Sequence, residues 1–225
     1  MALIIDTDIG SDVDDMIAIM YALQSGIDVK LISTVHADTR KRARIAKKLT
    51  NSMGYNITVA AGERMPLQQH HLYWRLDEGD EILDGTESLS FEENGVEAIA
   101  QTVRENRKHV SIAAIGPMTN IARVIEKYPG ISKDIEHIYI MGNAIIRNDE
   151  YILNYRAHNL KADPEAADIV FSAGIPTTLV TTDVCKQSSI SLDEFAELGK
   201  AGGALEMLAK SALHWLTNVA KREKV

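Results

Sequence analysis

Short apolar segments rich in β-branched residues alternate with segments of helical periodicity along most of the chain. The short segments predict strands at residues 3–6, 29–35, 57–60, 110–115, 135–141 and 177–181. Apolar residues at helical spacing predict helices at about residues 14–24, 39–53, 95–106, 117–127 and 163–172. Repeated strand–helix–strand units form parallel sheets. The predicted fold class is therefore α/β, with a Rossmann-like, mostly parallel central sheet and helices on both faces.

Two stretches depart from this alternation. Residues 68–94 are polar and contain two histidines, which predicts a long loop over the strand ends, a kind of loop that is often functional. After Ser188 the pattern becomes helical to the end of the chain. At 225 residues the chain has the length of one domain, and we expect residues 1–225 to form one.

The composition is that of an acidic globular protein. Hydrophobic residues make up 45% and charged residues 25%, and the net charge is −8, which argues against binding to nucleic acid. The basic run Arg40-Lys41-Arg42, with Arg44, Lys47 and Lys48, is predicted to lie on the solvated face of a helix. No apolar stretch is long enough to span a membrane, and the one cysteine, Cys185, allows no internal disulfide. We expect a cytoplasmic protein with no membrane partner.

Five aspartates fall within the first fifteen residues, between the first predicted strand and the first predicted helix. They are Asp6, Asp8, Asp12, Asp14 and Asp15. Open α/β sheets bind ligands at the carboxyl ends of their strands, and a hard divalent cation relieves the repulsion between clustered carboxylates. Capping of the following helix is the alternative, but it accounts for one or two of the five. The pattern predicts a cation site.

The segment 6–15 resembles the N-terminal signature of the inosine–uridine-preferring nucleoside hydrolases, an Asp-x-Asp followed by a glycine and an Asp-Asp pair. Further segments resemble family motifs in the same order along the chain. They are 61–67, Gly116-Pro117-Met118-Thr119-Asn120, Met141-Gly142, Asn159 with Asp163-Pro164-Glu165-Ala166-Ala167, and 180–183. Each match is weak alone, but several in order are specific.

The resemblance implies hydrolysis of the N-glycosidic bond of ribonucleosides with a bound calcium ion. Asp8 and Asp15 would be calcium ligands, and Asp8 would also take the proton from the attacking water. Thr119 would add its backbone carbonyl as a ligand; a hydroxyl at a helix start is the alternative. Asp14 and Asn159 would hold ribose hydroxyls, although Asn159 is equally well explained as a turn residue. The resemblance also implies a homo-oligomer.

The chain departs from the family pattern at several positions. Asp14-Asp15 follows Asp8 at a spacing two residues longer than in the commonest signature, which gives Asp12 a possible role. Asp38 lies opposite a family asparagine and is a candidate substrate contact, while the neighbouring His36 is predicted to be a packing residue. His158 replaces an aromatic residue, and Ala157 stands where the family has a ribose contact such as glutamate.

The last calcium ligand of the family lies in a His-Asp-Pro segment that the 225 residues do not contain. We expect this form to lack the family's C-terminal segment, to bind its ligands and to turn over slowly, with Asp183, Asp38 or Asp12 as candidate replacements.

Two other functions compete with this hypothesis. The opening 3–8 also resembles that of the haloacid-dehalogenase phosphatases, in which the first aspartate is a nucleophile and magnesium neutralises phosphate. That interpretation leaves 116–122 and 159–167 unexplained. The other alternative is a non-catalytic paralogue that binds ribose or calcium.

Overall fold

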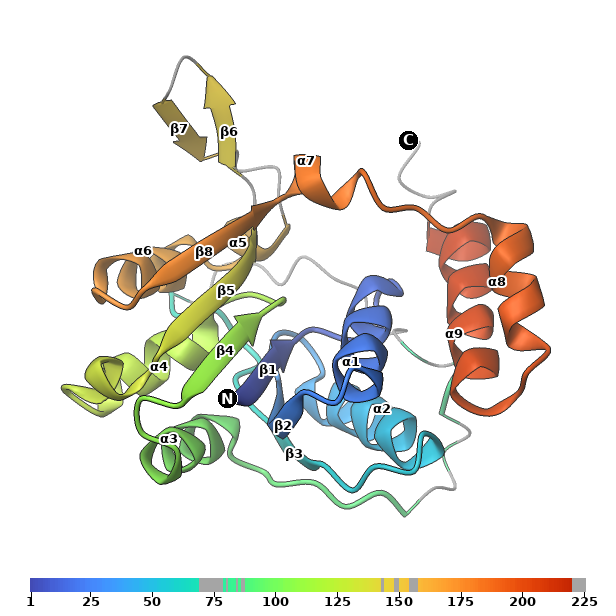
Figure 1. The fold of residues 1–225 in the computed structure, drawn as a ribbon, viewed down its shortest axis with the longest axis horizontal. Helices are drawn as coiled ribbons and strands as arrows, with labels where there is room; N and C mark the ends of the chain where they lie inside the picture. The colour runs from blue at the N-terminus through green and yellow to red at the C-terminus, as the bar shows by residue number, and fades with distance from the viewer. Residues whose placement is uncertain are drawn as a thin grey trace.

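A computed structural model describes residues 1–68, 79, 81–83, 85, 88–142, 144–147, 150–153 and 158–219. Its centre is a six-stranded sheet in the order β3-β2-β1-β4-β5-β8 (Figure 1). The strands are β1 (Ala2–Thr7), β2 (Asp28–Thr34), β3 (Thr58–Ala61), β4 (Val110–Ala114), β5 (His137–Gly142) and β8 (Thr177–Thr181). Every neighbouring pair in this sheet is parallel. The strand order reverses between β1 and β4.

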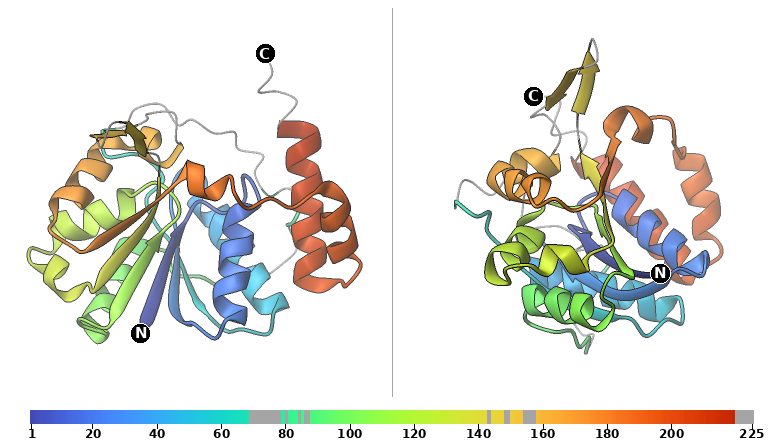
Figure 2. Two further views of the ribbon diagram at one scale, coloured as in Figure 1. Left: turned by 45° about the horizontal axis from the view of Figure 1, so that its top comes forward. Right: turned by 60° about the vertical axis from the view of Figure 1, so that its left-hand side comes forward.

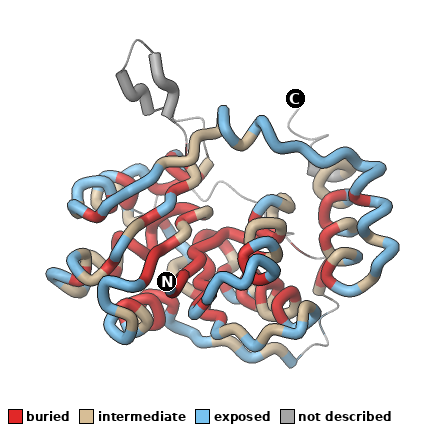
Figure 3. The backbone as a smooth tube through the Cα atoms, in the orientation of Figure 1, coloured by how far each residue is buried: buried red, intermediate tan, exposed pale blue. Residues whose placement is uncertain are grey.

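Helices cover both faces of the sheet (Figures 1 and 2). One core cluster joins the sheet to α3 (Gly95–Glu105), α4 (Thr119–Lys127) and α6 (Pro164–Ser172). The other joins it to α1 (Asp14–Gln24) and α2 (Thr39–Ser52). Both faces of β1 are buried, so its sequence is a continuous apolar run, as central parallel strands require. Figure 3 shows this buried centre and the more exposed edge strand β8.

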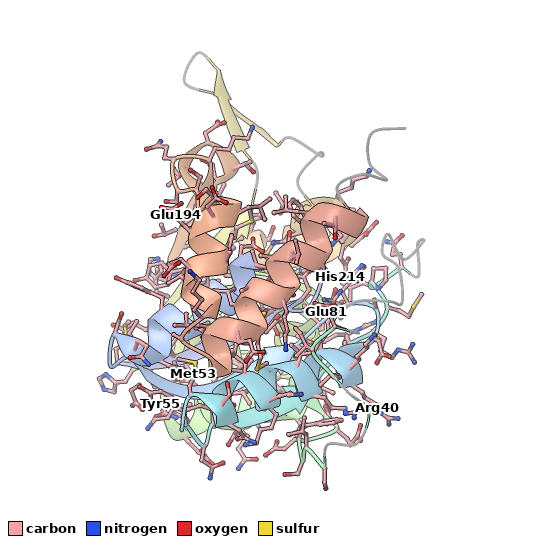
Figure 4. The ribbon with its side chains drawn as sticks, turned by 90° about the vertical axis from the view of Figure 1, so that its right-hand side faces the viewer. Arg40, Met53, Tyr55, Glu81, Glu194 and His214 are labelled. Carbon is pink, nitrogen blue, oxygen red and sulfur yellow. The ribbon has the colours of Figure 1, made fainter. Side chains whose placement is uncertain are left out.

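A helical hairpin follows the sheet. It consists of α8 (Leu192–Gly199) and α9 (Gly203–His214), and α9 continues into a π-helical turn, η2 (Trp215–Val219). Leu208 and Ala212 of α9 belong to the core cluster of α1 and α2. Ser211 Oγ donates a hydrogen bond to Glu81 Oε1 over 2.7 Å. Figure 4 shows Glu81 beside His214 at the end of α9. The hairpin therefore extends the layer of α1 and α2.

The predicted strands and the five predicted helices are all confirmed, with boundaries shifted by one or two residues. Pro117 was expected in the first turn of the fourth helix, but α4 begins only at Thr119 with Met118 as its N-cap. Several short elements were not predicted. They are η1 (Ile131–Asp134), α5 (His158–Ala162), α7 (Thr182–Cys185), and a separate antiparallel pair, β6 (Ala144–Arg147) and β7 (Glu150–Leu153). Most of the predicted loop in 68–94 and Ala157 lie outside the described residues.

Within the described residues, no helix combines the length and apolar character that a membrane span needs. The cytoplasmic location and the homo-oligomeric state expected from the sequence stay predictions.

Candidate active site

The ends of β1 and β4 meet at the point where the strand order reverses. The amides of Ile115 and Gly116 both donate to the carbonyl of Asp6, over 2.9 and 3.1 Å. A Cβ at Gly116 would lie 2.8 Å from the amide nitrogen of Asp8, so only glycine allows this approach. In doubly wound sheets the crevice outside such a reversal is the usual ligand site. The aspartates after β1 therefore stand where the fold favours binding.

The carboxylates after β1 lie close together and differ in burial. Asp8 and Asp15 are 6% and 5% exposed, Asp12 is half-buried and Asp14 is exposed. Burial, opposed by the charge of Arg42 and reinforced by that of Asp14, raises the pKa of Asp8 to about 6. Burial and the neighbouring carboxylates raise the pKa of Asp12 and of Asp15 well above the usual range. The cluster thus carries unfavourable negative charge that a cation would neutralise.

Three of these carboxylates form a group suited to a metal ion. Asp12, Asp14 and Asp15 offer oxygens that all lie within 4.8 Å of one another. The Thr7 hydroxyl donates to Oδ1 of Asp15 and fixes that carboxylate. An all-oxygen donor set suits a hard divalent cation. The family resemblance implied Asp15 as a ligand and the longer spacing left a role open for Asp12, and the structure brings both together with Asp14. Asp8, the other implied ligand, is not part of this group.

The Asp8 carboxylate lies beside the half-buried His158, whose ring contacts that of the buried His36. Nε2 of His158 is 3.6 Å from Oδ2 of Asp8, and the rings of His158 and His36 meet edge to face with centroids 5.4 Å apart. Burial is the main cause that lowers the pKa of His158 to about 3 and that of His36 to about 4. Both rings are therefore neutral near pH 7. His36 is 2% exposed, in keeping with the strand-end packing expected for it, and that role stays a prediction.

Asn159 bridges two strand ends. Its Nδ2 donates to the carbonyls of Ile115 and Met141, over 2.6 and 3.2 Å. These bonds hold the start of α5 against the ends of β4 and β5. The side-chain amide thus lies at the same edge of the sheet as the acidic cluster. A residue that only formed a turn would not need these two bonds to distant strand ends.

The side chains of Thr119 and Asp38 both form hydrogen bonds that stabilise the fold. The Thr119 hydroxyl donates to Oδ2 of the fully buried Asp163 over 2.6 Å, and Asp163 in turn caps α6 by accepting from the amide of Ala166. Asp38 caps α2, accepting from the amide of Lys41 over 3.1 Å. The metal contact of the Thr119 carbonyl and the substrate contact of Asp38 stay predictions.

The structure corrects the sequence interpretation at one position and adds to it at others. Arg42 was predicted to lie on a solvated face, and this is wrong, because its side chain is 1% exposed and its guanidinium reaches the loop after β1. Asn120 and Asp163 were named only as parts of motifs, yet each links segments far apart in the chain. The sequence signal that could have identified these two residues was their position within the motifs that follow the family order.

Together, the fold and this cluster define a Rossmann-like protein with grouped carboxylates, which could hold a metal ion, at its topological switch point. The sequence model described as inosine-uridine preferring nucleoside hydrolase matches residues 3–224. The pyrimidine-specific ribonucleoside hydrolase RihA of Escherichia coli O1:K1 is 32% identical over 100% of this chain and 74% of its own.

Solved structures agree with this match. A plant nucleoside hydrolase superposes with a TM-score of 0.81 at 26% identity, over 100% of this chain and 73% of its own. The purine-preferring ribonucleoside hydrolase of Gardnerella vaginalis gives 0.80 at 26% identity, over 98% and 75%. This chain belongs to the inosine-uridine preferring nucleoside hydrolase family. The family is metal-dependent, in keeping with the acidic cluster.

Proposed function

We propose that this protein hydrolyses the N-glycosidic bond of ribonucleosides to ribose and free base, with calcium as its cofactor. The observation that carries the proposal is the group of aspartates at the switch point, in a chain that matches the family along its length. The relatives differ in the base that they take, pyrimidine in RihA and purine in the Gardnerella enzyme. The proposal therefore names the ribonucleoside class and no single base.

The donor set is the support for calcium. The grouped oxygens of Asp12, Asp14 and Asp15 fit an ion that prefers several carboxylate ligands, and we propose that Asp8 and the Thr119 carbonyl complete the site. Bound calcium would orient the attacking water and lower its pKa. Magnesium suits this arrangement less well, since it retains most of its own water molecules.

Each remaining step falls to side chains of the chain itself. Asp8 accepts the proton from the attacking water, since its carboxylate is buried next to the grouped carboxylates that would hold the ion. Asp14 and Asn159 hold ribose hydroxyls, and Asp38 is a further candidate for this contact. The bond breaks through an oxocarbenium-like state, and the surrounding carboxylates stabilise its positive charge.

The decisive experiment compares Asp8→Asn with the parent in an assay of ribose release from inosine and from uridine. Loss of the base should lower kcat by about 10²–10⁴-fold. Asp28→Asn is the matched control, because Asp28 is exposed and pairs only with Lys30 in the described contacts. Unchanged ribose release by Asp8→Asn would contradict the proposal.

The same samples test the two alternatives. Cleavage of p-nitrophenyl phosphate with phosphorylation of Asp6 would favour the phosphatase. Calcium binding with no release of ribose by the parent would favour a non-catalytic paralogue. Removing calcium with a chelator should abolish ribose release, and adding calcium back should restore it better than magnesium does.

A further inference from the structure

The positively charged side chain of Arg42 is buried next to the acidic cluster. Arg42 belongs to the first turn of α2, and its side chain is 1% exposed. A cation near a helix N-terminus is unfavourable in the field of the helix dipole, and burial of its charge adds to the cost. The contacts of the guanidinium must offset both.

Those contacts join the loop after β1 to the turn after β2. Nη1 of Arg42 donates to the carbonyl of Asp8, to the carbonyl of Ile9 over 2.8 Å and to Oγ of Ser11 over 3.2 Å. Nε donates to the carbonyl of His36 over 2.9 Å. One planar group thus reaches both segments at once.

The turn after β2 is itself held firmly. His36 and Ala37 have φ of 69° and 58°, values uncommon for residues other than glycine. Their amides donate to the carbonyls of Glu63 and Arg64, over 2.8 and 3.0 Å. Arg42 therefore connects the loop that carries Asp8 to a turn whose amides are bonded to the loop after β3.

We propose that Arg42 is a positioning residue, whose guanidinium holds the Asp8 and Ile9 carbonyls and thereby places the Asp8 carboxylate and the turn behind it for calcium and substrate. The inference rests on the proposed function. The positive charge of Arg42 also reduces repulsion within the aspartate cluster. Lysine could supply this charge, but its ammonium is a single compact donor group and could not bond to both segments as the planar guanidinium does.

Substitutions can separate the effect of the positive charge from that of the planar guanidinium. Arg42→Lys keeps the charge, and Arg42→Met removes it at similar side-chain volume. Arg40→Lys is the matched control, since Arg40 lies on the exposed side of the same helix and pairs with Glu93. Thermal melts show which variants fold, calorimetry with calcium alone gives the dissociation constant, and initial rates with inosine and uridine at saturating calcium give kcat and KM.

We expect Arg42→Lys to fold, to bind calcium about 10–100-fold more weakly and to lose a similar factor in kcat, as is usual for residues that orient metal ligands. KM should stay within about threefold, since Arg42 does not touch substrate. Arg42→Met should lose as much or more. Arg40→Lys should match the parent.

Calcium affinity and kcat of Arg42→Lys within about twofold of the parent would overturn the proposal. If Arg42→Lys does not fold, a crystal structure of the parent with calcium decides: Nη1 away from the Asp8 and Ile9 carbonyls overturns the proposal, and Nη1 bonded to both supports it. A parent that binds calcium without releasing ribose contradicts the proposed function alone, and the calcium affinities still test Arg42.

Discussion

Nδ2 of Asn120 donates a hydrogen bond to Oδ1 of Asp6 over 2.8 Å, joining the start of α4 to the end of β1. Ser33 Oγ donates to the same oxygen over 2.6 Å. The other face of the Asn120 amide accepts from the amide of Glu63 over 2.7 Å. Asp6 is fully buried, and burial raises the pKa of its carboxyl to about 7. The hydrogen bonds from Asn120 and Ser33 therefore offset the cost of burying this carboxyl.

Asn120→Ala should therefore destabilise the fold. It removes a donor from a buried carboxyl and a partner from a backbone amide, which costs at least about 2 kcal/mol. Urea denaturation followed by circular dichroism measures the change in the free energy of unfolding. Asn51→Ala, on the exposed end of α2, is the control and should change stability by less than about 0.5 kcal/mol. Equal stability of the two variants would show that the network does not stabilise the fold.

Asp15→Ala should weaken calcium binding. The substitution removes one of three grouped carboxylates and the acceptor of the Thr7 hydroxyl, so the dissociation constant should rise at least about tenfold. Titration calorimetry with calcium measures it, with Asp28→Asn as the control for loss of one negative charge. A variant that binds calcium as tightly as the parent would place the ion elsewhere.

Gly116→Ala should displace Asp8. The new Cβ would stand 2.8 Å from the Asp8 amide nitrogen and 3.0 Å from its Oδ1, so the loop must move. A misplacement of this kind lowers kcat/KM by about 100-fold, and overpacking costs about 1–3 kcal/mol of stability.

Gly54→Ala separates these two effects. Gly54 has φ of 81° and open space around its Cα, so alanine there should cost about 1 kcal/mol and leave kcat/KM unchanged. Ribose-release rates and thermal melts of both variants provide the comparison. An equal kcat/KM for Gly116→Ala and Gly54→Ala would mean that the close approach of β1 and β4 has no part in the reaction.

Asn159→Ala should affect substrate binding more than turnover. Loss of the amide removes its proposed contact with a ribose hydroxyl, so KM should rise roughly tenfold, the worth of one good hydrogen bond. Asn106→Ala is the control, because Asn106 also donates to a carbonyl, that of Thr102 at the end of α3. A fall in kcat with unchanged KM would instead assign Asn159 to the positioning of the strand ends.

The sequence by itself determined the parallel sheet and the place of the acidic cluster, because both follow from local pattern. β1 is an apolar run that is buried on both faces and is followed by aspartates. The residues of this segment alone are therefore enough to predict the strand and the acidic loop after it. The local pattern predicted a cation site there, whereas the ligand roles of Asp8 and Asp15 came from the family resemblance and stay predictions.

Only the tertiary structure decided which distant residues complete the cluster. Asp6 meets Asn120 and Asp8 meets His158 because the strand order reverses between β1 and β4, and hydrophobic spacing along the chain does not specify that order. Arg42 shows the same limit. Charge in a basic run predicts exposure, whereas two of the carbonyls that accept from the buried guanidinium belong to Asp8 and Ile9, more than thirty residues away in the chain.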